Sequence, residues 1–399
     1  MIDKLITRQP ILDDQTSTFA YELLVKGGSE PIFDQRPEEK SDEPNIVEQL
    51  NVFCRDKKFF LPLSEQQMLE GHWSVLPKEK VVIEFPGSIK VKEDIIDAFA
   101  AAKGSGYGIA LSEFRYAAQL EPLVELSDYI KINTSTASER ELEAYSIKYA
   151  SQPVQLIADQ VEELNDYYQL RKMGYRYFQG NYYSKPEIIR SDSMPTSRIT
   201  KLRLIHEVNK QDFDFREAED ILKHDPGLTV KLLKYVNSAA MGLRTDVHSI
   251  RQALTMIGQR NLRKWISILA VSSFTDKKPN ELMRTITRRG QLCELLAPQF
   301  GFDHQQAQSL FLIGLFSLLD AVIDLPMEKV FDYIPLSDDI RETVIGEKTP
   351  FYDVLDLAIL IESGNWTKVA DLIAQYDLDE RQLIEAHVKA IEWSDSISE

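Results

Sequence analysis

Cysteine, glycine and proline are scarce in this chain of 399 residues, which has 2 Cys, 17 Gly and 17 Pro. Cys54 and Cys293 lie far apart in the sequence, which excludes a disulfide framework and a cysteine-based metal site. Few Gly and Pro together with 43% hydrophobic residues exclude collagen-like, low-complexity and disordered chains. No hydrophobic run approaches the ~18 residues of a membrane span, and the N-terminal residues lack the apolar core of a signal peptide. We therefore expect a cytoplasmic protein with no membrane segment.

Basic residues are also fewer than acidic ones. The chain has 46 basic and 63 acidic residues, for a net charge of −17, and the two halves carry −9 (residues 1–200) and −8 (residues 201–399). Phosphate repulsion would oppose binding at either half, so we expect no nucleic-acid partner. The richest basic stretch, Arg284 to Arg289, is typical of a solvated helix face.

The length predicts at least two domains. In residues 1–190, short apolar runs alternate with helix-like segments, which is typical of βαβ units and a parallel sheet. The predicted strands are 81–85, 108–111, 129–132 and 154–158, with helices over 92–103 and 139–149. These repeats fit a closed (β/α)8 barrel or an open sheet equally well. No glycine-rich nucleotide-binding loop follows any of the strands.

From residue 198 onward the pattern predicts an all-α domain, 198–399, joined to the first by a linker at 188–197. Asp225 is the expected N-cap and Pro226 the first residue of a helix that runs to Asn237. Ser249 and Gly258 are the expected start and stop of the next helix. Further helices are expected over 261–274, 306–322 and 352–362.

Acidic and polar residues follow the predicted strands of the first domain, where a barrel enzyme would carry its reacting groups. Carboxylates that converge with a lysine can hold divalent metals and activate water for phosphodiester cleavage. Taken singly, each is more typical of a strand end or a helix cap. The candidates are Glu22, Glu84, Ser112, Glu113, Lys131, Asp159, Glu162 and Gln179.

The order of these residues resembles the EAL domain family of cyclic di-GMP phosphodiesterases, over about residues 3–187. The matching segments are Glu22-Leu-Leu, Ile83-Glu, Ile130-Lys-Ile-Asn, Ile157-Ala-Asp-Gln-Val-Glu and Gln179-Gly, with Lys185-Pro after them. Each match is weak alone, whereas five in order are specific. The resemblance implies a TIM-type barrel.

Several positions depart from the family pattern. Pro62 stands where the family has a metal-binding Asn, and Ser112 stands where it has an Asp that bridges two metals. Glu113 is longer than the family residue and Asp159 is shorter. Lys26 replaces the arginine that reads the ligand phosphate, which removes a bidentate fork. Because two-metal catalysis needs both ions fixed, the resemblance with these losses predicts no catalytic residues and no bound metal.

The second domain resembles the HDOD family, helical relatives of HD phosphohydrolases that lack the metal ligands. The match covers about residues 198–395, and its landmarks are Asp225, Pro226, Asn237, Gly258 and Trp265. The chain's one His-Asp pair, His224-Asp225, precedes Pro226 and is interpreted as a helix cap. Where an HD enzyme carries its ligands, this chain has Ser317 and Leu318, and Asp320 is interpreted as structural. The sequence therefore predicts a binding or scaffolding module.

Together the two matches resemble bacterial EAL–HDOD, or YuxH-like, signalling proteins. We expect a non-enzymatic regulator in a cyclic di-GMP-related network that binds a signalling protein through the helical domain and has no cofactor. Two alternatives remain open. One is a metal-dependent cyclic di-GMP phosphodiesterase using Mg²⁺ or Mn²⁺, and the other is a sensor that binds cyclic di-GMP without cleaving it.

Overall fold

The computed structural model describes residues 4–26, 50, 52–54, 56–187, 219, 226–237, 247–275, 278–334 and 336–397. The chain divides into two compact units. The barrel unit comprises residues 1–185 and 359–388, and the helical unit comprises 186–358 and 389–399. This division differs from the predicted ranges, because 359–388 join the barrel. The predicted linker, 188–197, lies outside the described residues, so the boundaries at 190 and 198 stay predictions.

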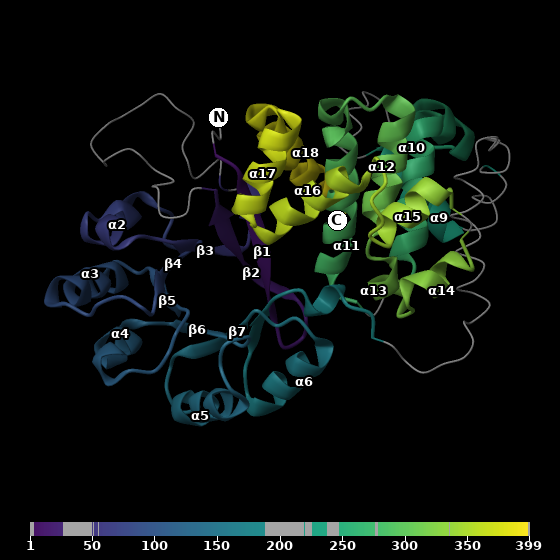
Figure 1. The fold of residues 1–399 in the computed structure, drawn as a ribbon. Coiled ribbons are helices and arrows are strands. Elements are labelled where there is room, and N and C mark those ends of the chain that lie inside the picture. The colour runs from purple at the N-terminus through teal and green to yellow at the C-terminus, as the bar shows by residue number, and fades with distance from the viewer. Residues whose placement is uncertain are drawn as a thin grey trace. The chain divides into compact units, whose positions relative to one another are not determined.

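The barrel unit is built on a closed barrel in which strands β1 to β8 follow one another in chain order (Figure 1). The closed barrel, rather than the open sheet, is therefore the observed architecture. The strands are β1 (Ile6–Asp13), β2 (Thr18–Val25), β3 (Lys58–Pro62), β4 (Val81–Pro86), β5 (Gly108–Ser112), β6 (Tyr129–Asn133), β7 (Gln155–Asp159) and β8 (Tyr177–Gln179). The four strands predicted from apolar runs correspond to β4 to β7.

The first strand runs in the opposite direction to the others. β1 pairs antiparallel with both β2 and β8, whereas β2 to β8 pair in parallel. The cause is local, because only four residues separate β1 from β2, and a parallel crossover needs about a dozen. Asp13 closes this turn by accepting hydrogen bonds from the backbone N–H groups of Gln15 and Ser17. The barrel therefore differs from the expected all-parallel one at this hairpin.

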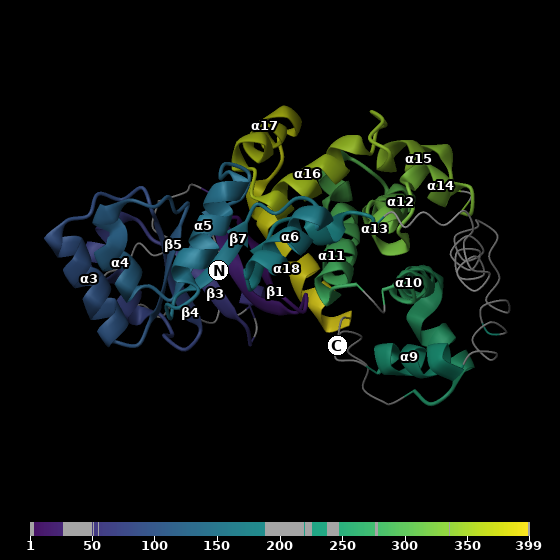
Figure 2. The same ribbon diagram turned by 90° about the horizontal axis from the view of Figure 1, so that it is seen from below.

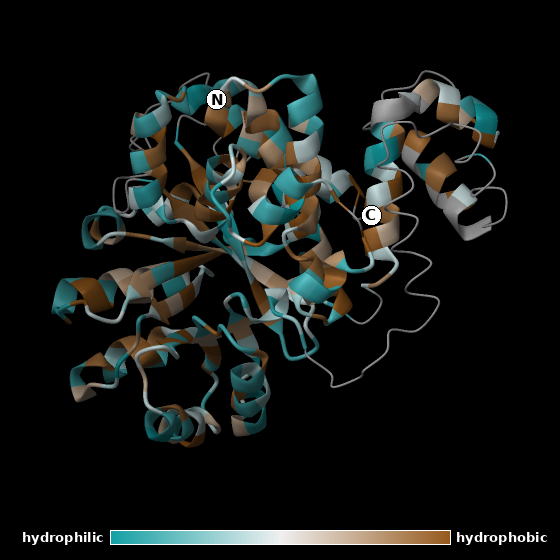
Figure 3. Cartoon of the chain, turned by 45° about the vertical axis from the view of Figure 1, so that its right-hand side comes forward, coloured by the Kyte–Doolittle hydropathy of each residue, from teal (hydrophilic) through white to brown (hydrophobic). Residues whose placement is uncertain are grey.

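Helices surround the parallel strands (Figure 1). They are α2 (Glu65–Leu69), α3 (Glu93–Gly104), α4 (Glu121–Leu126), α5 (Glu139–Tyr149) and α6 (Leu164–Met173). Capping boxes at Ser64 and Ser138 start α2 and α5, and Gly174, with φ 104°, ends α6. Figure 3 shows hydrophobic residues concentrated along the strands, whereas the helices mix hydrophobic and hydrophilic residues.

The C-terminal part of the barrel unit packs against β1 and β2. It contains the end of α16 (Tyr352–Ser363), all of α17 (Trp366–Tyr376) and the first half of α18 (Glu380–Ile397). Lys26, just after β2, forms an ion pair of 2.8 Å with Glu380, and the rings of Phe53 and His387 lie 6.5 Å apart. Sequence patterns predicted the helix over 352–362 but not its attachment to the barrel.

The helical unit contains no strand within the residues described. Its helices are α9 (Pro226–Val236), α10 (Ile250–Ser272), α11 (Asn280–Leu296), α12 (His304–Phe316), α13 (Leu319–Ile323), α14 (Met327–Phe331) and α15 (Asp338–Val344), with the start of α16 and the end of α18. Figure 2 shows α9 beside α10. Leu232 and Val236 of α9 pack with Leu262 and Trp265 of α10 in one buried cluster.

One helix prediction is confirmed and another needs correction. Gly258 interrupts the helical backbone, with φ 72° and ψ 161°, and the helical segment after it, predicted over 261–274, runs to Ser272 as the second part of α10. The single helix predicted over 306–322 is two, because Leu318 leaves the helical conformation at φ −129° and ψ 23° between α12 and α13.

The basic stretch on α11 is not a solvated face. Arg288 and Arg289 are only 3% and 7% exposed, and Arg289 donates a hydrogen bond to Ser317. Arg284 lies within ion-pair distance of Glu281 and Asp395. The helix is buried on nearly all sides, and the charge of Arg284 is paired with carboxylates rather than exposed to water. In the part of the chain that is described, no helix has both the length and the hydrophobicity needed to cross a membrane.

Candidate functional site

The site is built on the alternation of side chains along the barrel strands. A buried cluster inside the barrel contains Ile11, Ala20, Phe60, Val82, Ala110 and Ile157, with Tyr129 and Tyr177 packed against it. Because alternate residues of a strand face the same side, the residue two positions further toward the strand end also faces inward. On the parallel strands these next positions are Glu22, Pro62, Glu84, Ser112, Lys131, Asp159 and Gln179. Except for Glu113 and Glu162, the candidates from the sequence therefore share one tier at the C-terminal mouth of the barrel.

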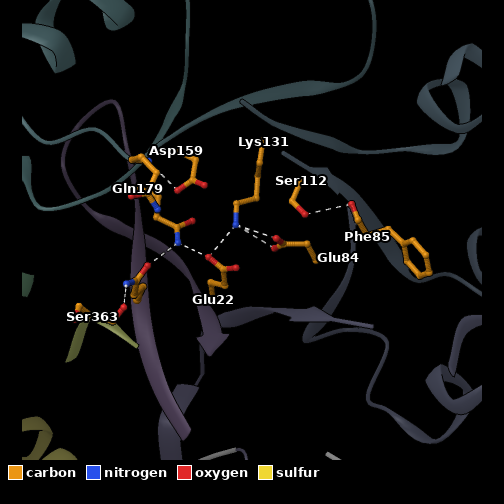
Figure 4. Close-up of polar contacts among 10 residues, drawn as sticks. Glu22, Glu84, Phe85, Ser112, Lys131, Asp159, Gln179 and Ser363 are labelled. Atoms are coloured by element: carbon orange, nitrogen blue, oxygen red, sulfur yellow. Dashed lines mark hydrogen bonds and ion pairs between the residues drawn. The ribbon is translucent and has the colours of Figure 1, made fainter. Parts of the chain in front are cut away.

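Lys131 is the centre of this tier (Figure 4). Its Nζ lies 2.8 Å from Glu22 Oε2 and 3.1 and 3.2 Å from the two carboxylate oxygens of Glu84. The Lys131 side chain is 1% exposed, and Glu22 and Glu84 are also buried. A buried ammonium is stable only when it is paired, and here two carboxylates provide the pairing.

Burial and mutual repulsion give the carboxyl groups of the tier different pKa values. Burial would raise the pKa of Glu22, but the Lys131 ammonium lowers it below its ordinary value. Burial and repulsion from Glu22 raise the pKa of Glu84 to about 8. Burial, with repulsion from Glu22, also raises the pKa of Asp159 to about 6. Despite burial, Glu22 and Glu84 raise the pKa of Lys131 above its ordinary value, so it stays protonated. The tier therefore carries more carboxylate than one lysine neutralises.

Gln179 completes the buried contacts. Its Nε2 donates hydrogen bonds to Glu22 Oε2 and to Gln9 Oε1, the latter at 3.1 Å. Its Oε1 is buried and has no hydrogen-bond partner in the structure. The residue after it, Gly180, has φ 142°, and a Cβ there would lie 2.1 Å from the carbonyl oxygen of Val161. Only glycine fits this turn, which fixes where Gln179 ends the strand.

Two candidates, Glu113 and Glu162, lie at the rim outside the tier, whereas Ser112 and Pro62 belong to it. Glu113 is exposed and has a positive φ of 49°, and Glu162 is exposed with weak contacts to Asn181. Ser112 donates a hydrogen bond of 3.3 Å to the carbonyl of Phe85. Pro62 pairs in register with Glu84, so it stands beside a buried carboxylate without offering a ligand atom.

The donor chemistry of the tier fits a hard divalent cation. Glu22, Glu84 and Asp159 offer only oxygen atoms, which Mg²⁺ and Mn²⁺ prefer, and repulsion from Glu22 adds to burial in raising the pKa values of Glu84 and Asp159. Among the residues described, no three acidic, histidine or cysteine side chains already converge as a metal site. Metal ligands are missing at Pro62 and Ser112, the two tier positions whose side chains are neither charged nor amides.

The positions that correspond to HD ligands are engaged in other contacts. Ser317 Oγ accepts a hydrogen bond from Arg289 and donates one to the carbonyl of Gly314, both at 2.8 Å. Asp320 accepts from the backbone N–H of Ala321. Asn237 bridges to both backbone groups of Val247, which ties α9 to the start of α10. Asp225 and the Pro226 side chain lie outside the described residues.

Comparison with known proteins agrees with this two-part organisation. Residues 194–327 match the HDOD domain. Over 406 aligned residues the chain is 28% identical to cyclic di-GMP phosphodiesterase CdgJ of Vibrio cholerae, covering all of this chain and 94% of that one. It is 27% identical to the uncharacterized protein YuxH of Bacillus subtilis, covering 97% of each. A solved standalone EAL protein of Vibrio cholerae, in its c-di-GMP-bound form, is 18% identical over 46% of this chain and 92% of that chain, with a TM-score of 0.33.

The chain has an EAL–HDOD architecture. The barrel with its ordered EAL motifs and the HDOD match account for its two parts. The expectation of a non-enzymatic protein is wrong, because CdgJ, which aligns with the whole chain, is named a cyclic di-GMP phosphodiesterase. The prediction gave too much weight to the positions lost at Pro62 and Ser112.

Gln9 of this EAL–HDOD chain was not predicted from the sequence. On β1 the inward position next to Ile11 is Gln9, counted backwards because the strand is antiparallel. Gln9 also stands directly opposite Glu22 in the β1–β2 register. The sequence feature that could have revealed Gln9 is the short turn between β1 and β2. Such a turn requires an antiparallel hairpin, so the inward-facing position on β1 at the level of Glu22 lies before Ile11 rather than after it.

Proposed function

We propose that the barrel hydrolyses cyclic di-GMP at the tier formed by Glu22, Glu84, Lys131, Asp159 and Gln179. The observation that carries this proposal is the buried contact of Lys131 with two carboxylates at the C-terminal mouth of the barrel, where barrel enzymes place their reacting groups. The full-length similarity to CdgJ supports the same activity.

The catalytic cation is proposed to be Mg²⁺ or Mn²⁺, held by Glu22, Glu84 and Asp159. When bound, it would supply Lewis-acid polarisation of the phosphodiester and would acidify the attacking water. Lys131, which stays protonated, provides positive charge for the phosphate oxygens as negative charge develops on them. Gln179 holds the Glu22 carboxylate, and its own buried Oε1 is left without a hydrogen-bond partner. Because Pro62 and Ser112 add no charged ligand, we expect turnover to require a high concentration of the metal.

The test is hydrolysis of cyclic di-GMP by the full-length protein across a series of Mn²⁺ concentrations, with the linear product resolved by chromatography. We expect metal-dependent product, and a loss of at least about a hundredfold in Glu22→Gln, which removes one ligand charge but keeps the shape. Glu125→Gln, an exposed glutamate on α4, is the matched control and should behave as wild type. Product that survives Glu22→Gln would assign the activity to a contaminant.

Binding without turnover has a separate outcome. Calorimetry with cyclic di-GMP in chelator and in Ca²⁺ measures binding independently of hydrolysis. Tight binding with no product at any Mn²⁺ concentration would contradict the phosphodiesterase proposal and favour the sensor alternative.

The helical unit is proposed to bind a signalling protein. The observation that favours this role is that Ser317 and its neighbour Leu318 stand where an HD enzyme has ligands, with the Ser317 hydroxyl already bonded to Arg289. Cross-linking the full-length protein in a lysate of its native host tests this role. Cross-links that map to residues 226–344 would support binding by the helical unit. Cross-links confined to the C-terminal mouth of the barrel would contradict it.

A further inference from the structure

A chain of hydrogen bonds runs from Glu22 to the turn between α16 and α17 (Figure 4). Glu22 accepts from Gln179 Nε2, and the same nitrogen donates to Gln9 Oε1 at 3.1 Å. Gln9 Nε2 then donates to the backbone carbonyl of Ser363 at 3.3 Å. The proposed metal ligand Glu22 is thus linked through two glutamine amides to a turn that is 341 residues later in the chain.

Both ends of this chain fix the orientation of the amides. The Glu22 carboxylate, which forms a 2.8 Å ion pair with Lys131, accepts the hydrogen bond, so Gln179 must present its NH₂ group to it. The Ser363 carbonyl also can only accept, so Gln9 must present its NH₂ group to the turn and its oxygen to Gln179. A flip of either amide would bring two acceptors or two donors together. The two glutamines therefore hold one arrangement as long as the turn stays in place.

The turn approaches the strand that carries Glu22 very closely. Gly364 has φ 67°, and a Cβ built there would lie 2.6 Å from Leu24 Cδ1 and 3.3 Å from Leu24 Cβ. Leu24 is two residues after Glu22 on β2. The ion pair between Lys26 and Glu380 holds the start of α18 to the same strand end. Rotation of the Leu24 side chain would relieve the contact with Cδ1 but not the one with Cβ. A side chain at position 364 should therefore shift the turn from β2 by a few tenths of an ångström and lengthen the hydrogen bond from Gln9.

We propose that Gln9 is a positioning residue for the barrel site and that the α16–α17 turn sets its orientation. Through Gln179, Gln9 holds the Glu22 carboxylate in one rotamer. This role deepens the proposed phosphodiesterase function, on which its kinetic part rests. It also makes the site depend on a segment that follows the HDOD domain in the sequence, so displacement of this turn would lower turnover.

The first experiment tests the hydrogen-bond chain by NMR and requires neither enzymatic activity nor bound metal. The full-length protein is labelled with ¹⁵N at glutamine side chains and studied by NMR in chelator, with signals of Gln9 and Gln179 assigned by their loss in Gln9→Met and Gln179→Met. Gln9→Met keeps the length of the side chain and removes both hydrogen bonds. We expect it to shift the Gln179 amide signals, and we expect Gly364→Ala to shift the signals of both glutamines.

Gly71→Ala is the matched control. Gly71 has φ 70°, close to that of Gly364, but a Cβ there would meet no atom within 4 Å. Both substitutions therefore impose the same backbone strain, and only that at Gly364 displaces a neighbour. The Gln9 and Gln179 signals should be unchanged in Gly71→Ala. Shifts of equal size in both alanine variants would overturn the assignment of the turn, as would a Gln179 signal unmoved by Gln9→Met.

The second experiment measures kcat and KM for cyclic di-GMP with Mn²⁺, together with the melting temperature. We expect Gln9→Met and Gly364→Ala each to lower kcat about tenfold, with KM within about twofold of wild type. Gly71→Ala should keep the wild-type kcat. A fall in melting temperature with unchanged kcat would show that Gln9 is merely structural and would overturn the proposal. A wild-type protein without turnover would refute the phosphodiesterase function, while the NMR result would still decide the hydrogen-bond chain.

Discussion

Replacing Glu84 with glutamine should make the stability of the protein less dependent on pH. The pKa of Glu84 rises from an ordinary value of 4.5 to about 8, chiefly because of burial and then because of repulsion from Glu22. Between these two values the folded protein holds a proton that the unfolded chain releases, so the free energy of unfolding falls as the pH rises. Glu84→Gln cannot ionise, so it lacks this loss. It also keeps the side-chain shape and one acceptor for Lys131.

The size of the effect follows from the pKa values. A rise from 4.5 to about 8 corresponds to about 5 kcal/mol over the whole titration, of which about 2 kcal/mol falls between pH 6 and pH 8. Urea unfolding of the full-length wild type and of Glu84→Gln, in chelator at pH 6, 7 and 8, should show the variant gaining by this amount. Glu125→Gln, on the surface, should follow the wild type at each pH.

Two results would refute the reasoning about Glu84. A stability difference that stays constant from pH 6 to pH 8 would mean that Glu84 is ionised throughout and fully neutralised by Lys131. A difference that shrinks as the pH rises would mean that the Glu84 carboxylate stabilises the folded state. Addition of Mn²⁺ at pH 8 should stabilise the wild type more than the variant, since the cation binds the ionised carboxylates.

Four further substitutions test the geometry of the two units. Gly180→Ala should cost more than about 2 kcal/mol of stability in urea unfolding, because its Cβ would lie 2.1 Å from the Val161 carbonyl oxygen. Gly314→Ala should cost about 1–3 kcal/mol, because its Cβ would lie 2.7 Å from the backbone of α11, whereas Gly301→Ala, with no atom within 4 Å, tests positive-φ strain alone. Ser112→Asp should lower the Mn²⁺ concentration for half-maximal hydrolysis about tenfold, since it adds a carboxylate to the tier.

Much of the barrel could be predicted from local patterns. The apolar runs at 81–85, 108–111, 129–132 and 154–158 form strands. Strands of a parallel barrel are buried on both faces, so their sequences are short and almost continuously apolar. Their ends are marked by Glu84, Lys131 and Asp159, polar residues that are two positions after a buried inward-facing residue. The strand ends and the order of the EAL-like motifs therefore predicted most of the tier.

Long-range packing explains what the sequence did not reveal. Gln9 could not be recognised from strand ends, because β1 is antiparallel to its neighbours and its residue at the mouth of the barrel lies before Ile11, toward the N-terminus of the strand. Residues 359–388 join the barrel unit through single contacts such as Lys26 with Glu380, which leave no periodic signal. Arg288 on α11 was interpreted as solvated because an arginine on a helix is usually exposed, whereas here neighbouring helices bury it.

The missing carboxylate at position 112 and the hydrogen-bond chain from Glu22 to Ser363 should both affect metal binding, and their effects should depend on each other. A metal held by few carboxylates depends strongly on the orientation of each, so Glu22 matters most while position 112 is serine. Adding a ligand with Ser112→Asp should therefore reduce the penalty of Gln9→Met on the Mn²⁺ concentration required for hydrolysis. The double-mutant cycle compares wild type, both single variants and Gln9→Met/Ser112→Asp in the full-length protein. We expect the penalty of Gln9→Met to shrink several-fold in the aspartate background. Equal penalties in both backgrounds would show that Gln9 acts on turnover by a route that does not pass through the orientation of Glu22.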